Sequence, residues 1–340
     1  MIETRAGTLH RQAMVLLSHD HLWEPTDFAA AVTGGVTAHV VMPFVDVEIW
    51  GGQEAFDATA RREDDHAKRA LMAFDRVLAY IEARPDQTLL VRSIEDLYEA
   101  KRSGRGGVIL GSEGARLVEG SLELLRGYQR MGLRQVQLNW DFPNRVAACQ
   151  NDVDAADSGL TEFGRDLIRE MNRLGMLVDT SHSSHRTRLE VFEHSDRPVT
   201  HGHAGAKRIT DRPQNMTDDE LKALAANGGV IGLHFFSRLV NQKGPDAGQA
   251  HLEDLYAHID HIARIAGMET IALGPDWFPF HPFGGWTREQ GFTFVETLES
   301  IDRLPNLTRG LLEHGYGEAD VEAILGGNLL RVLRAVLPAA

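Results

Sequence analysis

Short apolar runs recur along the chain, and between them lie longer stretches whose apolar residues are spaced as on one face of a helix. The runs have the length of buried strands and are followed by polar or turn-forming residues. The predicted strands are 13–17, 37–44, 107–110, 135–138, 176–178, 198–200, 230–236 and 270–273. The predicted helices are 26–31, 54–83, 93–100, 122–131, 161–174, one between 182 and 203, 217–226 and 251–266, followed by a mostly helical tail, 289–337.

The regular alternation of strand and helix predicts a parallel sheet, because parallel strands need long crossover connections. Eight such strands predict an α/β fold, a (β/α)8 TIM barrel with extra C-terminal helices. No linker or low-complexity tract interrupts the chain, so residues 1–340 are predicted to form one domain. A doubly wound open sheet is the alternative. Such a sheet would normally carry a glycine-rich phosphate loop after its first strand, where this chain has Ser-His-Asp-His at 18–21.

Metal-competent side chains stand at the ends of the predicted strands. A barrel gathers the carboxyl ends of its strands on one rim, which is where active sites of this fold lie. Residues two apart on a strand face the same side, so an HxH pair can bind one ion. Imidazoles and carboxylates suit Zn²⁺ and similar ions. The candidate ligands are His19, His21, Glu113, His182, His203 and Asp276.

These donors suit a centre with two divalent ions, for which zinc is the favoured metal. A carboxylate such as Glu113 can offer one oxygen to each ion, and a hydroxide held between the ions would attack an amide carbonyl. Asp276 is the predicted catalytic residue, since it can bind an ion and also accept the proton of the attacking water. Each residue alone has a structural explanation, such as a strand or helix cap, and the joint placement favours metal binding. Strand alternation puts His201 and His203 on one face, so spacing leaves either as the ligand. Asp179 is expected to support a ligating imidazole.

The composition argues against several classes of partner and site. The net charge of −14 argues against nucleic acid and against an anionic membrane surface as partners. The single cysteine, Cys149, excludes an internal disulfide and a cysteine-based zinc site. The N-terminus lacks a basic start followed by a long apolar run, and no apolar run is long enough to span a bilayer. The expected partner is a small-molecule substrate, and the expected compartment is the cytoplasm.

Several segments resemble one enzyme family. They are GLTEFGRDLIREMNRLGMLVDTSHSS (159–184), PVTHGHAGAKRITDRPQNMTDDELKALAANGGVIG (198–232), IALGPD (271–276) and GGNLLRVL (326–333). Together they resemble the membrane (renal-type) dipeptidase family, peptidase family M19 of the amidohydrolase superfamily, with this chain as a divergent member. The resemblance implies a barrel with a two-zinc centre that hydrolyses dipeptides, assembled as a homodimer.

By position, the resemblance also assigns residues. The family's ligand positions correspond to His19, Glu113, His182, His203 and Asp276, with Glu113 as the bridge and His203 preferred to His201. His21 stands where the family usually has aspartate, which gives HxH in place of HxD.

The positions that read the substrate depart from the family pattern. Gln214 replaces the arginine expected to clamp the substrate's C-terminal carboxylate, and Arg212, which could replace it, is out of register by two residues. Trp140 replaces a histidine expected to contact the substrate carbonyl, and His234 begins His-Phe-Phe in place of Asn-Phe-Tyr. Trp140, Gln214 and His234 are therefore the predicted substrate-binding residues. We expect weak cleavage of ordinary L-dipeptides.

The function predicted from the sequence is a binuclear metal-dependent hydrolase of a dipeptide or a related small amide. One alternative is a hydrolase of a lactam, lactone or ester that lacks a free carboxylate. Another is a non-catalytic metal-binding barrel, against which the intact Asp276 argues, since a binder needs no proton acceptor.

Overall fold

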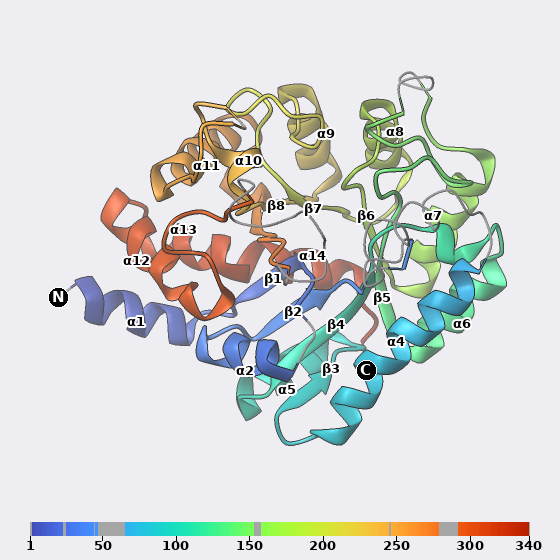
Figure 1. Cartoon of the computed structure of the whole chain (residues 1–340), viewed down its shortest axis with the longest axis horizontal. Coiled ribbons are helices and arrows are strands. Elements are labelled where there is room, and N and C mark those ends of the chain that lie inside the picture. Colours follow the sequence, from blue (N-terminus) through green and yellow to red (C-terminus); the bar gives the residue numbers. More distant parts are fainter. Residues whose placement is uncertain are drawn as a thin grey trace.

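A closed barrel of eight parallel strands forms the centre of the molecule, and helices surround it (Figure 1). The computed structural model describes residues 2–22, 25–43, 45–46, 65–152, 158–244, 246–278 and 292–339. The strands are β1 (Leu16–Asp20), β2 (Ala38–Val41), β3 (Thr88–Leu90), β4 (Gly106–Ser112), β5 (Leu133–Gln137), β6 (Leu177–Asp179), β7 (Thr200–Ala204), β8 (Val230–Leu233) and β9 (Ile271–Leu273). Around the barrel their order is β2-β1-β9-β8-β7-β6-β5-β4, and pairing of β2 with β4 closes it. The predicted TIM barrel is confirmed.

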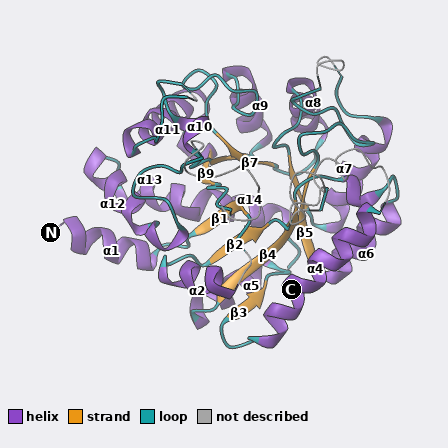
Figure 2. Ribbon diagram, viewed as in Figure 1, coloured by secondary structure: helices purple, strands orange, loops and turns teal. Residues whose placement is uncertain are grey.

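Helices cover the outside of the barrel, as Figure 2 shows in purple around the orange strands. The α-helices are α1 (Ile2–Gln12), α2 (Pro25–Thr33), α4 (His66–Ala83), α5 (Ile94–Ser103), α6 (Leu122–Met131), α7 (Glu162–Leu174), α8 (His185–His194), α9 (Asp218–Asn227), α10 (Ser237–Val240), α11 (Leu252–Ala266), α12 (Pro305–His314), α13 (Glu318–Glu322) and α14 (Asn328–Val336). Of the long helix predicted over 54–83, residues 54–64 lie outside the described residues. Among the helices described, none combines the length and the apolar character needed to cross a membrane.

The C-terminal helices predicted from the sequence are present, and α14 belongs to the core. Its apolar face, which includes Leu329, Leu333 and Val336, is buried in one cluster with Leu16 of β1 and Val230 of β8. Within it, α14 lies against the start of β9, where Asn328 donates to the Ile271 carbonyl, at the opposite end from the predicted ligands. The tail therefore closes the amino-terminal end of the barrel and leaves the carboxyl-terminal rim for chemistry.

A ninth strand, β3, was not predicted. It pairs with the first half of β4, where Thr88 lies opposite Gly106 and Leu90 opposite Val108. The run is three residues long and does not stand out from the helices on either side. It adds to the sheet without entering the closed ring.

The observed strands are shifted relative to the prediction at three places that matter for the site. β1 covers 16–20 where 13–17 was predicted, and β7 covers 200–204 where 198–200 was predicted. β8 ends at Leu233, before His234. His19 and His203 therefore lie within strands. The polar residues that follow the predicted apolar runs are buried and extend the strand pairing.

The barrel interior is narrow below the rim. The Ser18 hydroxyl donates to the carbonyls of Gly202 and Leu273, at 2.7 and 2.9 Å. A methyl group at Gly232 would lie 1.9 Å from the Gly202 carbonyl oxygen, and one at Gly274 would lie 1.8 Å from the same atom. Only glycine fits where another backbone segment approaches this closely.

Substituting Gly232→Ala is expected to destabilise the fold by about 3 kcal/mol, because the clashing atom belongs to backbone and cannot rotate away. Urea unfolding followed by circular dichroism measures the change. Gly127→Ala is the control, because a methyl group there, within α6, meets nothing within 4 Å. It should stabilise the protein by about 0.5–1 kcal/mol. Equal stability of both variants would contradict the packing described for the interior.

Candidate metal centre

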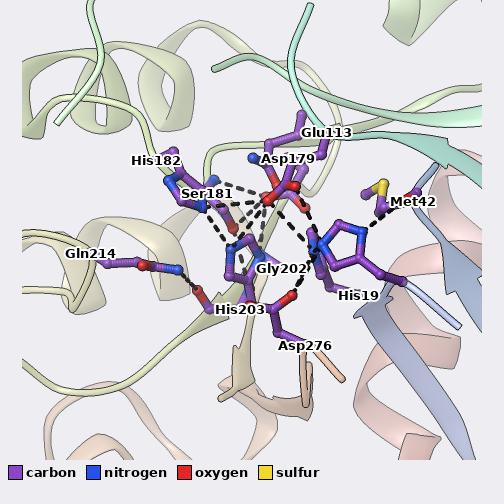
Figure 3. Close-up of polar contacts among 12 residues, drawn as sticks. His19, Met42, Glu113, Asp179, Ser181, His182, Gly202, His203, Gln214 and Asp276 are labelled. Atoms are coloured by element: carbon purple, nitrogen blue, oxygen red, sulfur yellow. Dashed lines mark hydrogen bonds and ion pairs between the residues drawn. The ribbon is translucent and has the colours of Figure 1, made fainter. Parts of the chain in front are cut away.

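The six predicted ligands come together in one cluster at the carboxyl-terminal rim, and Figure 3 labels five of them. Four of the six line a pocket there: His21, Glu113, His182 and Asp276. The six ligands come from five different strands or the residues that follow them. His19 lies in β1 and His203 in β7, and the other four come directly after a strand or within three residues of its end: His21, Glu113, His182 and Asp276. The pocket encloses about 260 Å³, which suits a small molecule.

Three donors form the first group: His19, His21 and Asp276. The Nε2 atoms of His19 and His21 are 3.3 Å apart, and Asp276 Oδ1 lies 3.4 Å from the first and 3.2 Å from the second. Ligands of a tetrahedral zinc ion with bonds of 2.0–2.1 Å are separated by about 3.3 Å. Glu113 Oε2 lies 3.3 Å from His21 Nε2 and supplies a fourth donor. The group has the spacing of a zinc site.

His182 and His203 form a second group around the other oxygen of Glu113. Their Nε2 atoms are 3.0 Å apart. Glu113 Oε1 lies 3.4 Å from His182 Nε2 and 3.8 Å from His203 Nε2. The side chain of Glu113 therefore lies between two donor groups and turns one oxygen towards each. Three protein donors would leave room for another ligand on a second ion.

Unsatisfied polar atoms at the centre are explained by bound cations. Glu113 Oε2 and Asp276 Oδ1 are buried and have no hydrogen-bond partner among the residues described. Buried carboxylate oxygens without a partner are costly. Ring nitrogens facing each other at 3.0–3.3 Å need a proton or a cation between them. Two divalent ions would satisfy all of these atoms.

Without ions, protons hold the cluster together. Burial alone would lower the pKa of His21, but the charges of Glu113 and Asp276 raise this pKa to about 10. For His182, burial is likewise outweighed by Asp141 and Glu113, which raise its pKa to about 10. Burial opposes ionisation of Glu113, and the surrounding histidines nevertheless keep its pKa well below the ordinary value. Metal binding must therefore displace protons from the imidazoles.

Outer partners orient two of the imidazoles. His21 Nδ1 lies 2.7 Å from the Met42 carbonyl, and His182 Nδ1 lies 2.8 Å from Asp141 Oδ1. Such contacts select which ring nitrogen faces a metal. Sequence reasoning missed Asp141, although it stands directly after Trp140 at a predicted strand end. The Met42 contact uses backbone and has no sequence signal.

His203, and not His201, reaches the cluster. The pairing of β7 with β8 shifts register between His201 and Ala204, so simple alternation fails there. His201 instead lies between the Thr180 hydroxyl, at 2.9 Å, and the Gln214 carbonyl, at 3.2 Å. The expectation that the two histidines share a face is wrong because of this bulge.

Asp179 was expected to support a ligating imidazole, but its carboxylate instead accepts from backbone N–H groups and from the Gln135 amide. Its Oδ1 accepts from the N–H groups of Ser181 and Gly202, both at 2.9 Å, and its Oδ2 accepts from Gln135 at 2.8 Å. The Ser181 hydroxyl in turn accepts from the N–H of His203 at 3.2 Å. Asp179 thus ties together the segments that carry His182 and His203.

Two candidate ligands have left-handed backbone conformations. The φ angles of His182 and Asp276 are 61° and 57°. This region is unfavourable for residues other than glycine, and such strain collects at functional sites. The surrounding packing therefore stabilises an unfavourable backbone conformation that directs these two side chains towards the centre of the cluster.

Comparison with known proteins decides the family. The profile of membrane dipeptidases, peptidase family M19, matches residues 10–340. The chain belongs to this family. The family assignment agrees with the resemblance found in the sequence, and its members include metallodipeptidases.

Individual relatives are similar over most of the chain. An uncharacterized dipeptidase of Schizosaccharomyces pombe is 32% identical over 273 residues, which cover 79% of this chain and 60% of that protein. Dipeptidase verJ of Clonostachys rogersoniana is 30% identical over 269 residues, which cover 79% and 65%. The chain thus spans less than two thirds of the length of these curated relatives.

Solved structures share the fold over nearly their whole length. An amidohydrolase from Pseudomonas aeruginosa has 27% identity and a TM-score of 0.80, covering 98% of this chain and 99% of that one. The probable dipeptidase PvdM from the same organism has 17% identity and a TM-score of 0.84, covering 99% and 98%. Because PvdM is only 17% identical to this chain, its similarity shows a shared fold and nothing further.

The three predicted substrate-binding residues line the same pocket as four of the predicted ligands. Trp140, Gln214 and His234 all contribute to its wall, together with the apolar rings of Phe236 and Phe278. The Gln214 amide nitrogen donates to the His203 carbonyl at 3.3 Å. One donor of the glutamine is thus already engaged by the protein.

His234 holds the carboxylate of Asp276. Its Nδ1 accepts from the N–H of Phe236 at 2.8 Å, so its proton resides on Nε2. That nitrogen donates to Asp276 Oδ2 at 3.0 Å, which leaves Oδ1 directed at His19 and His21. Burial lowers the pKa of His234 and favours this neutral form.

Substituting His234→Phe is expected to lower kcat by about 10- to 100-fold, because the ring volume remains while the hydrogen bond that aligns Asp276 is lost. His234→Gln, which restores an N–H donor, should recover part of the activity. Steady-state kinetics of the zinc-loaded variants measure both effects. Activity of His234→Phe equal to that of the unchanged protein would show that the contact does not align Asp276.

Proposed function

We propose that this chain is a two-metal hydrolase that cleaves the C–N bond of a dipeptide or a related small amide, with zinc as the resident ion. The observation that carries the proposal is the position of Glu113, which directs one carboxylate oxygen to each of two donor groups. The chain's membership of a family that includes metallodipeptidases supports the reaction class.

The chain's own residues account for the proton transfers. Bound divalent ions would polarise the substrate carbonyl and make a water molecule more acidic. Asp276 accepts the proton of the attacking water and delivers it to the leaving nitrogen. Water adds to the carbonyl carbon, the C–N bond breaks, and the products are a carboxylic acid and an amine. His234 keeps Asp276 in the orientation that this transfer needs.

The pocket wall supports a small substrate. Trp140, Phe236 and Phe278 supply an apolar surface beside the donors, which suits the side chains of a short amide.

The proposal is tested by removing and restoring the metal. The purified chain is analysed for bound metal, stripped with a chelator, and reloaded with Zn²⁺, Mn²⁺ or Co²⁺. Each form is assayed against dipeptides, N-acyl amino acids, lactams and esters. We expect two ions per chain, loss of hydrolysis on stripping, and recovery on reloading. A chain that binds no ion after reloading and hydrolyses none of these compounds would refute the proposal.

A further inference from the structure

Asp20 and His39 form a buried pair beside the first donor group, and the proposed reaction uses neither of them. Asp20 lies in β1 between His19 and His21, and His39 lies in the neighbouring strand β2. His39 Nδ1 lies 2.9 Å from Asp20 Oδ2. Because an ionised carboxylate only accepts hydrogen bonds, the ring carries a proton on Nδ1 and donates it to Asp20.

The His39 ring has no other hydrogen bond among the residues described. Its Nε2 is buried and lacks a partner there. The ring packs edge-on against Phe28 of α2, with the two ring centres 5.8 Å apart. A buried nitrogen without a partner costs free energy, so an apolar side chain would suit packing against α2 better. The contact with Asp20 is therefore what favours a histidine at this position.

Asp20 lies where the regular pairing of β1 with β2 is interrupted. Leu17 lies opposite His39 and Asp20 opposite Val41, so β1 advances three residues where β2 advances two. Such a bulge leaves backbone unpaired and bends the strand. The Asp20 carboxylate fastens this segment, because Oδ2 accepts from His39 and Oδ1 accepts from the N–H of Leu22 at 2.8 Å. One side chain thus fixes both the bulge and the turn that follows it.

The fastened segment carries the first donor group. His19 and His21 stand directly before and after Asp20. The N–H of His21 donates to the Trp277 carbonyl at 2.9 Å, and the N–H of Asp276 donates to the His19 carbonyl at 3.3 Å. A displacement of this part of β1 would therefore also move the backbone of Asp276. All three donors of the first group depend on the position of one backbone segment.

We infer that His39 is a positioning residue for the first metal ion, since it holds, through Asp20, the backbone that aims the three donors of the first group. The inference rests on the proposed two-metal centre and gives one of its ions a separate structural support. The histidines of the second group follow β6 or lie in β7, whereas the pair connects β1 with β2. Loss of His39 therefore weakens one ion selectively.

The test measures zinc binding and not activity alone. Zinc is titrated into chelator-stripped protein in competition with a chromophoric chelator, which resolves two binding steps. His39→Leu should weaken one step by about 10- to 100-fold, the range for loss of a contact that orients a metal ligand, and change the other by less than about 2-fold. The visible spectrum of the cobalt-loaded protein should change as well, since it reports the geometry of the ligands around the ion.

Two polar variants separate the contact from packing. His39→Asn places an amide nitrogen close to the position of Nδ1, so it can donate to Asp20 and should recover part of the zinc affinity. His39→Gln places its amide nitrogen close to the position of Nε2, on the side away from Asp20, and should not. If His39→Leu fails to fold, the difference between these two variants decides, and equal zinc affinities of both would overturn the inference.

His10→Leu is the matched control. His10 is also buried, and its ring lies 2.6 Å from the Thr308 hydroxyl and 2.7 Å from the Gly34 carbonyl, outside both donor groups. Urea unfolding should show a loss of stability for both leucine variants, whereas only His10→Leu should keep both zinc affinities.

The outcomes distinguish this inference from the proposed reaction. If His39→Leu binds both ions as tightly as the unchanged protein, or loses affinity equally in both steps, His39 has only a structural role and the inference is wrong, while the proposed reaction stands. If one step is weakened selectively but no compound of the panel is hydrolysed, the inference stands and the proposed reaction fails. A chain that binds no zinc would overturn both.

Discussion

Substituting Glu113→Gln is expected to remove at least one of the two ions and to lower kcat/KM by about 10³-fold or more. Glutamine has nearly the same size, but its amide has one oxygen and no charge, so it cannot offer an anionic oxygen to both donor groups. The loss of Lewis-acid stabilisation amounts to several kcal/mol, which corresponds to this rate factor. Metal analysis by mass spectrometry and steady-state assays of the same preparation measure both effects.

The control for this variant is Glu123→Gln. It removes the same charge from an exposed position, where 79% of the side chain is accessible. It should keep two ions and full activity. If Glu113→Gln retained both ions and wild-type turnover while Glu123→Gln behaved likewise, the carboxylate between the histidine pairs would have no part in metal binding.

The architecture was predictable because each level of the sequence pattern agrees with the fold. Apolar runs alternate with amphipathic stretches, and helix starts carry their own signals. Ser93 and Thr217 both form the capping boxes that their sequences predict, with Asp96 and Glu220 as the reciprocal partners. Once the strands form a barrel, the polar residues at their ends must converge. For this reason six donors far apart in sequence could be placed together.

The finer geometry was not predictable from periodicity. Strand alternation assumes an unbroken ladder, and the two strands that carry inward histidines both shift register. The shifts lie between Leu17 and Asp20 in the pairing of β1 with β2, and between His201 and Ala204 in the pairing of β7 with β8. Bulges re-aim side chains at barrel rims, and they leave no clear mark in a pattern of polar and apolar residues.

The contacts around the donors depend on long-range packing, which a single sequence does not reveal. The hydrogen bond from His234 to Asp276 joins the segments that follow β8 and β9 and orients the His234 ring. From the sequence, His234 was predicted only to bind substrate. The position of Arg212 depends on Arg188 and Asn215, which hold its loop. The weak cleavage expected for ordinary L-dipeptides stays a prediction.

Substituting Asp276→Asn is expected to lower kcat by about 10³-fold, within the range for loss of a general base. Asparagine keeps an oxygen near His19 and His21 but cannot accept the proton of the attacking water. Burial opposes ionisation of Asp276, but the surrounding imidazoles hold its pKa well below the ordinary value, so the carboxylate is ionised. Steady-state kinetics at saturating Zn²⁺ measure the loss.

The metal content of the same variant decides how that loss is interpreted. If two ions remain bound and kcat still falls, the missing function is proton acceptance, because the electrostatic part of the site is intact. The pair His182 and His203, which lies beside Oε1 of Glu113, should keep its ion in any case. Turnover by Asp276→Asn equal to that of the unchanged protein would assign the proton transfer to another group. His234 could not be that group, because neither ring nitrogen is free to accept a proton. Its Nδ1 already accepts from the N–H of Phe236, and its Nε2 carries the proton that points to position 276.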